Sequence, residues 1–353
     1  MATIMSSPDI LSQVMTHLGL RKLYQVEAVS AAWREAAVGE RRTRCVFRFE
    51  VTLGRGKGSA GGEFDLPFFV CSLPSRDCVL VSDFFNHRLQ TLSTAAGSSA
   101  HQVVVGKEEG VALSCPTGLV CDDAFCFVAE SGSSCLQKLR LSDWSLILGT
   151  GRHGSAEGEL RHPHGLALDA KRLFVADNDN HRICVFDHQL AFRASFGWQG
   201  GGQGELRDPC GLAVHRRQLF VADLGNHRLQ VFTVRGRWLR SIGREGRAPG
   251  EFLGPWGVAV ARLAQGVVLC VSESRARRVQ VLGLDGTPLQ VLAPPGAGSL
   301  AGLCVEHHGS GVETRARRLF VADYEHHSLL VLSVWSWSEA RRGCLSCEST
   351  EVR

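Results

Sequence analysis

Aromatic residues and net charge are both scarce in this 353-residue chain. Phe, Trp and Tyr make up 7% of the residues, and only two residues are Tyr. The 39 Lys and Arg residues exceed the 35 Asp and Glu residues by four, which is too few to indicate nucleic-acid binding by itself. No apolar run approaches the roughly 20 residues that a membrane-spanning helix needs, so we expect no membrane association.

The N-terminus lacks the basic start and apolar core of a secretory signal peptide. We therefore expect an intracellular protein, located in the cytoplasm, the nucleus or both. The 13 Cys residues should then be reduced, and their odd number favours free thiols over a disulfide framework. Cys344 and Cys347 form a Cys-x-x-Cys pair without the further ligands that zinc needs. We expect 336–353 to be a disordered tail, and the protein to need no metal or other cofactor.

Glycine, by contrast, is abundant, with 39 residues spread along the chain, and it accompanies an internal repeat. "FVADNDNHRICVF" (Phe174–Phe186) and "FVADLGNHRLQVF" (Phe220–Phe232) are nearly the same segment. Four weaker copies occur elsewhere, each with an acidic residue at the fourth position. These anchors follow one another at intervals of 46 to 50 residues and are Asp83, Glu130, Asp177, Asp223, Glu273 and Asp323. The chain therefore contains six repeats.

A second motif precedes each anchor, as in "GWQGGGQGELRDPCGLAV" (Gly197–Val214). Each repeat thus begins with a Gly-rich loop and Pro-x-Gly, and continues with short runs of Val, Leu and Phe separated by turn residues. Such runs are typical of short β-strands. Four strands in about 45 residues match the size of one β-propeller blade.

The two motifs together closely resemble the NHL repeat. This resemblance implies a mostly β, six-bladed NHL-type propeller over 45–335, which we expect to be monomeric. The last repeat lacks a fourth strand, whereas "CVFRFEVTLG" (Cys45–Gly54) precedes the first Gly-rich loop without a partner. We expect 45–54 to complete the last blade, because closure removes two exposed sheet edges.

The repeated Asp-x-x-Asn-His segment has two interpretations. It is either a structural turn, because Asp and Asn bond nearby backbone amides, or a ring of metal ligands. Recurrence in separate blades and replacement in two repeats favour the structural turn. Its residues are Asp83, Asn86, His87, Asp177, Asn180, His181, Asp223, Asn226, His227 and Asp323.

The middle residue of Pro-x-Gly differs in every repeat. In NHL-type propellers this residue lies at the mouth of the central channel. Exposed aromatic side chains commonly anchor binding partners, so we expect a partner-binding surface here, with the alternative that some of these side chains are buried. The candidate residues are Phe68, Thr117, His164, Cys210 and Trp256.

The segment 6–44 has a helical pattern and resembles a small three-helix F-box domain. Ser7 and Pro8 fit a helix start, and apolar residues then recur with helical spacing. The resemblance implies docking on the Skp adaptor of a cullin-RING ubiquitin ligase; the alternative is a small appendage of the propeller. The expected contact residues are Pro8, Ile10, Leu11, Val14, Leu18, Leu23 and Trp33.

These features favour a non-catalytic substrate-recognition subunit of an SCF-type ubiquitin ligase, whose propeller binds a target protein that the sequence does not identify. One alternative is an RNA-binding propeller or a general protein-interaction propeller. Arg88, Arg182, Arg228 and the two "RARR" runs (Arg275–Arg278 and Arg315–Arg318) would supply charge for RNA. A metal-dependent lyase or hydrolase is a third possibility, for which the channel offers only His164 and Cys210.

Overall fold

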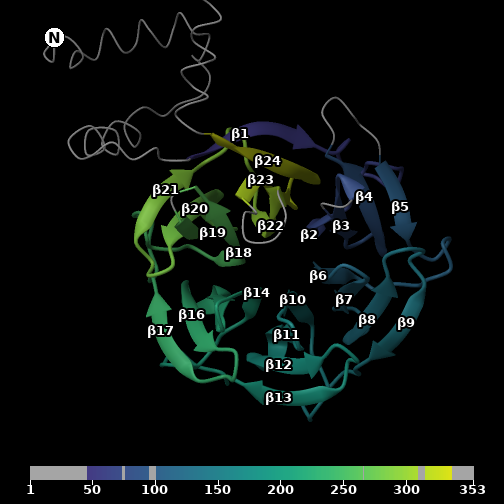
Figure 1. Ribbon diagram of the computed structural model, residues 1–353, viewed down its shortest axis with the longest axis horizontal. Helices are drawn as coiled ribbons and strands as arrows, with labels where there is room; N and C mark the ends of the chain where they lie inside the picture. The colour runs from purple at the N-terminus through teal and green to yellow at the C-terminus, as the bar shows by residue number, and fades with distance from the viewer. Residues whose placement is uncertain (1–45, 74–75, 95–100, 265, 309–314, 336–353) are drawn as a thin grey trace, which may run out of the picture. The chain divides into compact units, whose positions relative to one another are not determined.

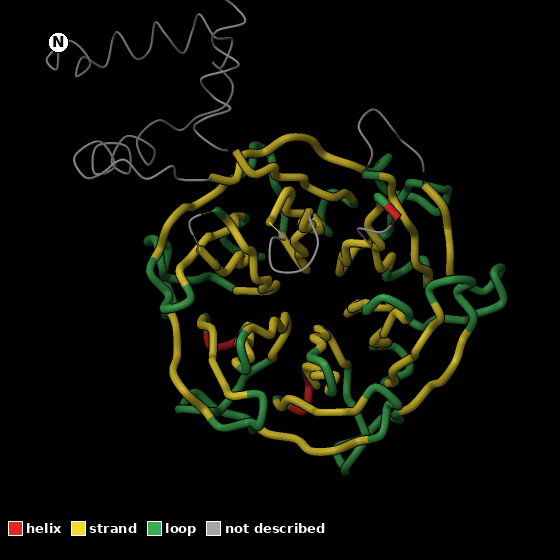
Figure 2. Tube along the Cα trace, viewed as in Figure 1, coloured by secondary structure: helices red, strands yellow, loops and turns green. Residues whose placement is uncertain are grey.

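The computed structural model describes residues 46–73, 76–94, 101–264, 266–308 and 315–335. The chain divides into two units, Met1–Thr43 and Arg44–Arg353. The expected F-box-like helices of 6–44 and the expected tail of 336–353 lie outside the described residues. Within the described ranges there is no α-helix, and strands dominate (Figure 2). None of the described helical segments is long and apolar enough to cross a membrane.

The described strands form six antiparallel four-stranded sheets arranged around a central axis (Figure 1), which confirms the predicted six-bladed propeller. Blade 1 contains β2 (Pro67–Leu73), β3 (Cys78–Asp83), β4 (Arg88–Ser93) and β5 (His101–Val105), and blade 2 contains β6 (Pro116–Cys121), β7 (Phe125–Glu130), β8 (Cys135–Arg140) and β9 (Leu146–Thr150). Blade 3 contains β10 (Pro163–Leu168), β11 (Arg172–Asp177), β12 (Arg182–Asp187) and β13 (Phe192–Phe196), and blade 4 contains β14 (Pro209–His215), β15 (Gln218–Asp223), β16 (Arg228–Thr233) and β17 (Trp238–Ile242). Blade 5 contains β18 (Pro255–Leu263), β19 (Gly266–Glu273), β20 (Arg278–Gly283) and β21 (Pro288–Leu292).

Blade 6 combines strands from both ends of the described chain. It contains β22 (Leu300–His308), β23 (Arg315–Asp323) and β24 (Ser328–Trp335), with β1 (Val46–Leu53) as its outer strand. β1 pairs antiparallel with β24, from Phe47 opposite Val334 to Leu53 opposite Leu329. The ring is thus closed by the strand that the sequence places at 45–54 (Figure 1).

The apolar core lies between neighbouring blades. In "LFVAD" of blade 4, Leu219, Phe220, Val221 and Ala222 are all fully buried, because the second strand of a blade is covered on both faces. Phe220 packs with Leu269 of blade 5 in one apolar cluster. The continuous apolar run in this part of the repeat therefore reflects a strand with no solvent-facing side.

Polar side chains also cross every interface between blades. At five interfaces an Arg or Lys donates to a backbone oxygen on the hairpin that joins the third and fourth strands of the next blade. These pairs are Arg76 with Leu141, Lys138 with His188, Arg172 with Val234, Arg240 with Leu284, and Arg318 with Thr94. Between blades 5 and 6, Gln290 exchanges hydrogen bonds of 3.1 and 2.9 Å with the backbone of Phe47. Each blade is thus tied to the next by hydrogen bonds as well as by apolar packing.

Candidate functional site

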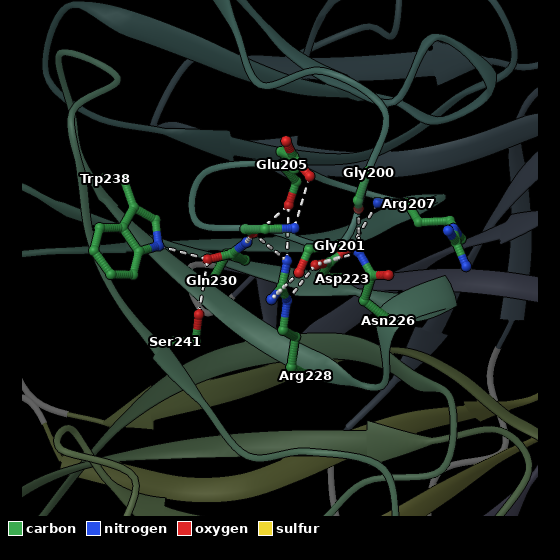
Figure 3. A network of polar contacts seen from close by, with 11 residues as sticks. Gly200, Gly201, Glu205, Arg207, Asp223, Asn226, Arg228, Gln230, Trp238 and Ser241 are labelled. Carbon is green, nitrogen blue, oxygen red and sulfur yellow. Dashed lines mark hydrogen bonds and ion pairs between the residues drawn. The ribbon is translucent and has the colours of Figure 1, made fainter.

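The six acidic anchors lie at the ends of the second strands, and each is no more than 2% exposed. In blade 4 (Figure 3), Asp223 accepts hydrogen bonds from the Arg207 backbone N–H at 2.7 Å, from Arg228 Nε at 2.8 Å and from Asn226 Nδ2 at 3.0 Å. Burial raises the pKa of Asp223 above its ordinary value. The surrounding hydrogen-bond donors compensate for the hydration that this buried carboxylate loses on folding.

The same network holds the Gly-rich loop in place. Arg228 donates to the backbone oxygens of Gly201 (2.8 Å) and Glu205 (3.0 Å), which Figure 3 labels. It also donates to the backbone oxygen of Gly202 (2.7 Å). Gln230 Nε2 donates to the oxygen of Glu205 at 2.7 Å. The guanidinium thus uses its donors inside the blade, on the backbone oxygens of the Gly-rich loop.

Three other blades repeat the buried ion pair. Its members are Asp83 with Arg88 (2.7 Å), Asp177 with Arg182 (2.8 Å) and Glu273 with Arg278 (2.5 Å). In blade 2, Glu130 instead accepts from the Ser114 N–H (2.7 Å) and from Ser133 Oγ (3.0 Å). Burial raises the pKa of Glu130 as well. The degenerate repeat of blade 2 therefore retains the buried acid, but serine rather than arginine donates to it.

The repeated histidines connect neighbouring blades. Their residues have left-handed backbone φ angles between 51° and 54°. Each Nδ1 accepts a backbone N–H from the next blade: His87 from Cys115 (3.0 Å), His181 from Asp208 (3.1 Å), His227 from Gly254 (3.0 Å) and His327 from Leu66 (3.2 Å). In the part of the chain that the structure describes, no three His, Cys, Asp or Glu side chains are placed to hold a metal ion.

Two of the predicted channel-mouth residues do not reach the surface. Thr117 and Cys210 are fully buried. Thr117 Oγ1 donates to the Pro163 oxygen of blade 3 at 2.7 Å. Cys210 Sγ lies 3.5 Å from His164 Nδ1, and burial raises the pKa of this thiol well above its ordinary value. The prediction that Thr117 and Cys210 present their side chains to a partner is therefore wrong.

The three large side chains at the same repeat position meet one another. They extend from β2, β10 and β18, which are innermost strands of blades 1, 3 and 5 (Figure 1). The Phe68 ring centroid lies 5.3 Å from that of Trp256 and 5.7 Å from that of His164, with the rings nearly perpendicular. The His164 and Trp256 rings stack at 5.8 Å. Burial, with a smaller effect of nearby His162, lowers the pKa of His164 to about 4, so its ring is neutral at pH 7.

Sequence reasoning missed three further aromatic residues. Phe84 stacks on Phe68 at 4.8 Å and contacts Phe85 at 5.0 Å, while Tyr324 lies 6.0 Å from Trp256. All three follow an acidic anchor by one or two residues, where the repeat is variable. Phe85 is 54% exposed. We call Phe68, Phe84, Phe85, His164, Trp256 and Tyr324 the aromatic mouth.

Comparison with known proteins supports the repeat and the fold. The family model described as the NHL repeat matches residues 160–186, which include β10, β11 and most of β12. No curated protein sequence matches the chain. The chain is therefore a six-bladed β-propeller that contains an NHL repeat.

Solved propellers of varied description have a similar fold. An auxiliary nutrient-binding protein from Bacteroides ovatus has a TM-score of 0.59 at 8% identity, covering 83% of this chain and 78% of that one. A virginiamycin B lyase from Staphylococcus aureus has 0.54 at 12%, covering 83% and 99%. A chain of a nidogen/laminin complex has 0.53 at 16%, covering 74% and 97%. At these identities the likeness concerns the fold alone.

Proposed function

We propose that this protein is a non-catalytic substrate-recognition subunit of an SCF-type ubiquitin ligase. The F-box-like segment 6–44 would bind the Skp adaptor, and the propeller would bind a target protein in the cytoplasm or nucleus. The aromatic mouth is the observation that carries the proposal. It gathers six rings from blades 1, 3, 5 and 6 into one cluster of ring contacts.

The aromatic mouth has the character of a protein-binding surface. Aromatic side chains dominate the binding energy of many interfaces because they bury a large area at a low entropic cost. Phe85 is exposed, and Phe68, Trp256 and Tyr324 are half-buried, so their contacts within the propeller leave surface for a partner. Packing between the rings fixes their positions before binding, which lowers the cost of association.

The contacts of most of these arginines favour protein over RNA as the partner. Arg88, Arg182 and Arg228, which the RNA hypothesis needs, each pair with a buried acid and donate to loop carbonyls. Arg318 of the second "RARR" run likewise pairs with Glu306 at 2.7 Å. A guanidinium that is already bonded in this way has few donors left for phosphate.

The adaptor part of the proposal depends on the sequence of 6–44. Leu11, Val14 and Leu18 follow helical spacing, and Trp33 belongs to the last part of the resemblance to an F-box. Truncating a buried anchor at an interface can cost about 2 kcal/mol or more. Replacing Leu11 and Trp33 together by Ala should therefore abolish adaptor binding.

Co-precipitation from cells that express the full chain tests both parts. The double variant Leu11→Ala/Trp33→Ala should lose the Skp adaptor and retain the target. Phe85→Ala/Trp256→Ala should retain the adaptor and lose the target. Trp198→Ala is a matched control, since Trp198 is 60% exposed on the Gly-rich loop of blade 4 and outside the aromatic mouth.

Two outcomes would contradict the proposal. If the wild-type chain never recovers the adaptor, the F-box interpretation is wrong. If Phe85→Ala/Trp256→Ala keeps every partner that the Trp198→Ala control keeps, the recognition surface lies elsewhere.

A further inference from the structure

An exposed arginine of blade 5, Arg275, lies beside the start of β18, which carries Trp256. Arg275 follows the buried acid Glu273 by two residues, in the turn between β19 and β20. The Ser274 N–H of this turn donates to the Gly254 oxygen at 2.9 Å. The stem of Arg275 lies over Gly254, since a Cβ built on that glycine would be 3.2 Å from Arg275 Cγ. Gly254 is two residues before Trp256, so the Arg275 stem lies next to the start of β18, which carries Trp256.

Two guanidinium groups on this blade have no counter-charge among the described residues. Arg247, on the Gly-rich loop, and Arg275 are both exposed, and neither side chain forms a hydrogen bond or ion pair within the described part of the chain. The neighbouring cations are already paired: Arg277 with Glu325 at 2.9 Å, Arg278 with Glu273 at 2.5 Å, and Arg244 with Glu251 at 2.8 Å.

The remaining acidic residue of this region, Glu245, lies near a histidine of blade 4. Its carboxylate lies 3.9 Å from Nε2 of His227. Arg247 and Arg275 therefore add two positive charges, unpaired among the described residues, to the turn and loop of blade 5, and Arg275 brings one of them beside the start of β18, which carries Trp256. We call these two residues the blade 5 arginines.

The aromatic rings form a continuous track away from these arginines. Successive ring centroids lie 5.3 Å apart from Trp256 to Phe68, 4.8 Å from Phe68 to Phe84, and 5.0 Å from Phe84 to Phe85. The track runs from blade 5 across the channel mouth to the exposed Phe85 of blade 1. An extended peptide advances about 3.3 Å per residue, so the track accommodates a segment of at most roughly four to five residues.

From this arrangement we infer that the aromatic mouth binds a short extended peptide segment with an anionic group at one end and an apolar side chain at the other. The anionic group contacts the blade 5 arginines, and the apolar side chain lies over Phe84 and Phe85. Guanidinium groups pair with both carboxylate and phosphate, so an Asp, a Glu or a phosphorylated residue supplies the required charge. The inference rests on the proposed function, because it specifies the ligand of the same surface.

Selection from a randomised nine-residue peptide library on the purified full-length chain tests the inference. Enriched peptides should carry an acidic residue three to five positions from an aromatic or aliphatic residue. The double variant Arg247→Glu/Arg275→Glu should lose this acidic preference and bind the enriched peptide at least tenfold more weakly. Phe85→Ser should weaken binding while the acidic preference remains.

Arg235→Glu/Arg237→Glu is the matched control. These arginines are also exposed and unbonded through their side chains among the described residues, but they lie on the hairpin at the other end of blade 4. Synthetic forms of the enriched peptide with Glu, phosphoserine or Gln at the acidic position distinguish the source of the charge by fluorescence anisotropy. Tighter binding of either anionic form than of the Gln form supports the inference.

Absence of enriched acidic peptides, equal binding of the Gln form, or equal losses in the two double variants would overturn the inference. These measurements do not involve the Skp adaptor. If co-precipitation succeeds while the library shows no acidic preference, the proposed function remains and the peptide chemistry is wrong. If the library result holds while the adaptor does not bind, the ligase assignment is wrong.

Discussion

Replacing Arg228 by Ala measures how strongly the propeller depends on the buried network of a single blade. In the wild type, the guanidinium pairs with Asp223 at 2.8 Å and donates to three carbonyl oxygens of the Gly-rich loop. Truncation leaves Asp223 fully buried, with only the Asn226 side chain and the Arg207 N–H as donors. Removing one partner of a buried ion pair costs about 3–5 kcal/mol. We expect Arg228→Ala to lose that much unfolding free energy at pH 7.

Arg193→Ala is the matched control. Arg193 forms an exposed ion pair with Asp187 on the outer part of blade 3, with Nε at 2.9 Å from the carboxylate. Exposed pairs contribute about 0–1 kcal/mol because water and salt screen them. Equilibrium unfolding in urea, followed by tryptophan fluorescence, gives both free energies on the same protein.

The pH dependence of the stability loss in Arg228→Ala provides a second check that the unpaired Asp223 carboxylate causes it. Burial already raises the pKa of Asp223 in the wild type, and loss of the Arg228 charge raises it further. In the variant the folded state therefore takes up a proton at a higher pH than the unfolded state does. The loss of stability should shrink as the pH falls from 7 towards 5. A loss no larger than that of Arg193→Ala, or one that grows with acidity, would refute the reasoning.

Two further predictions concern ring closure and His164. Deleting 1–54 should lower the midpoint of thermal unfolding strongly, whereas deleting 1–39 should not. The reason is that β1 contributes the buried Phe47 (2% exposed) and pairs with the edge of β24. Equal midpoints for the two deletions would contradict this prediction. The contribution of His164 to wild-type stability should fall by about 3 kcal/mol as the pH falls from 6.5 to 4, because the unfolded chain protonates His164 near 6.5 and the folded protein only at about 4. The His164→Gln variant should lack this contribution when the free energy of unfolding in urea is measured between pH 6.5 and 4. Identical pH profiles for the variant and the wild type would contradict the role of His164.

The sequence was sufficient to predict the blades because each repeat contains a complete structural unit. The acid ends the second strand, its Arg and Gln bind the Gly-rich loop, and its His reaches the next blade, as Asp223, Arg228, Gln230 and His227 do in blade 4. Residues with such dependent roles recur together. Their spacing therefore predicted the number of blades without any knowledge of the packing between them.

The exposure of the middle residue of Pro-x-Gly could not be predicted in the same way. It depends on whether the side chain is small enough to fit in the space between its own blade and the neighbouring blade. Adjacent innermost strands are close: a Cβ on Gly118 would lie 2.1 Å from the His164 oxygen. Small side chains such as Thr117 and Cys210 fit between the strands and are buried. Phe68 and Trp256 are too large for that space, and they meet over the channel instead.

Variability within the repeat is therefore not sufficient evidence of a binding role, as Trp198 shows. Its Nε1 donates to Glu205 at 3.2 Å, where Arg152 and Arg244 at the equivalent positions bind Glu159 and Glu251. Trp198 in place of arginine therefore preserves the hydrogen bond to the glutamate of the loop. No other aromatic ring among the described residues contacts Trp198. The aromatic mouth differs because its variable residues come from separate blades and contact one another. The proposed binding site therefore rests on residues that the repeat does not require and that nevertheless meet in space.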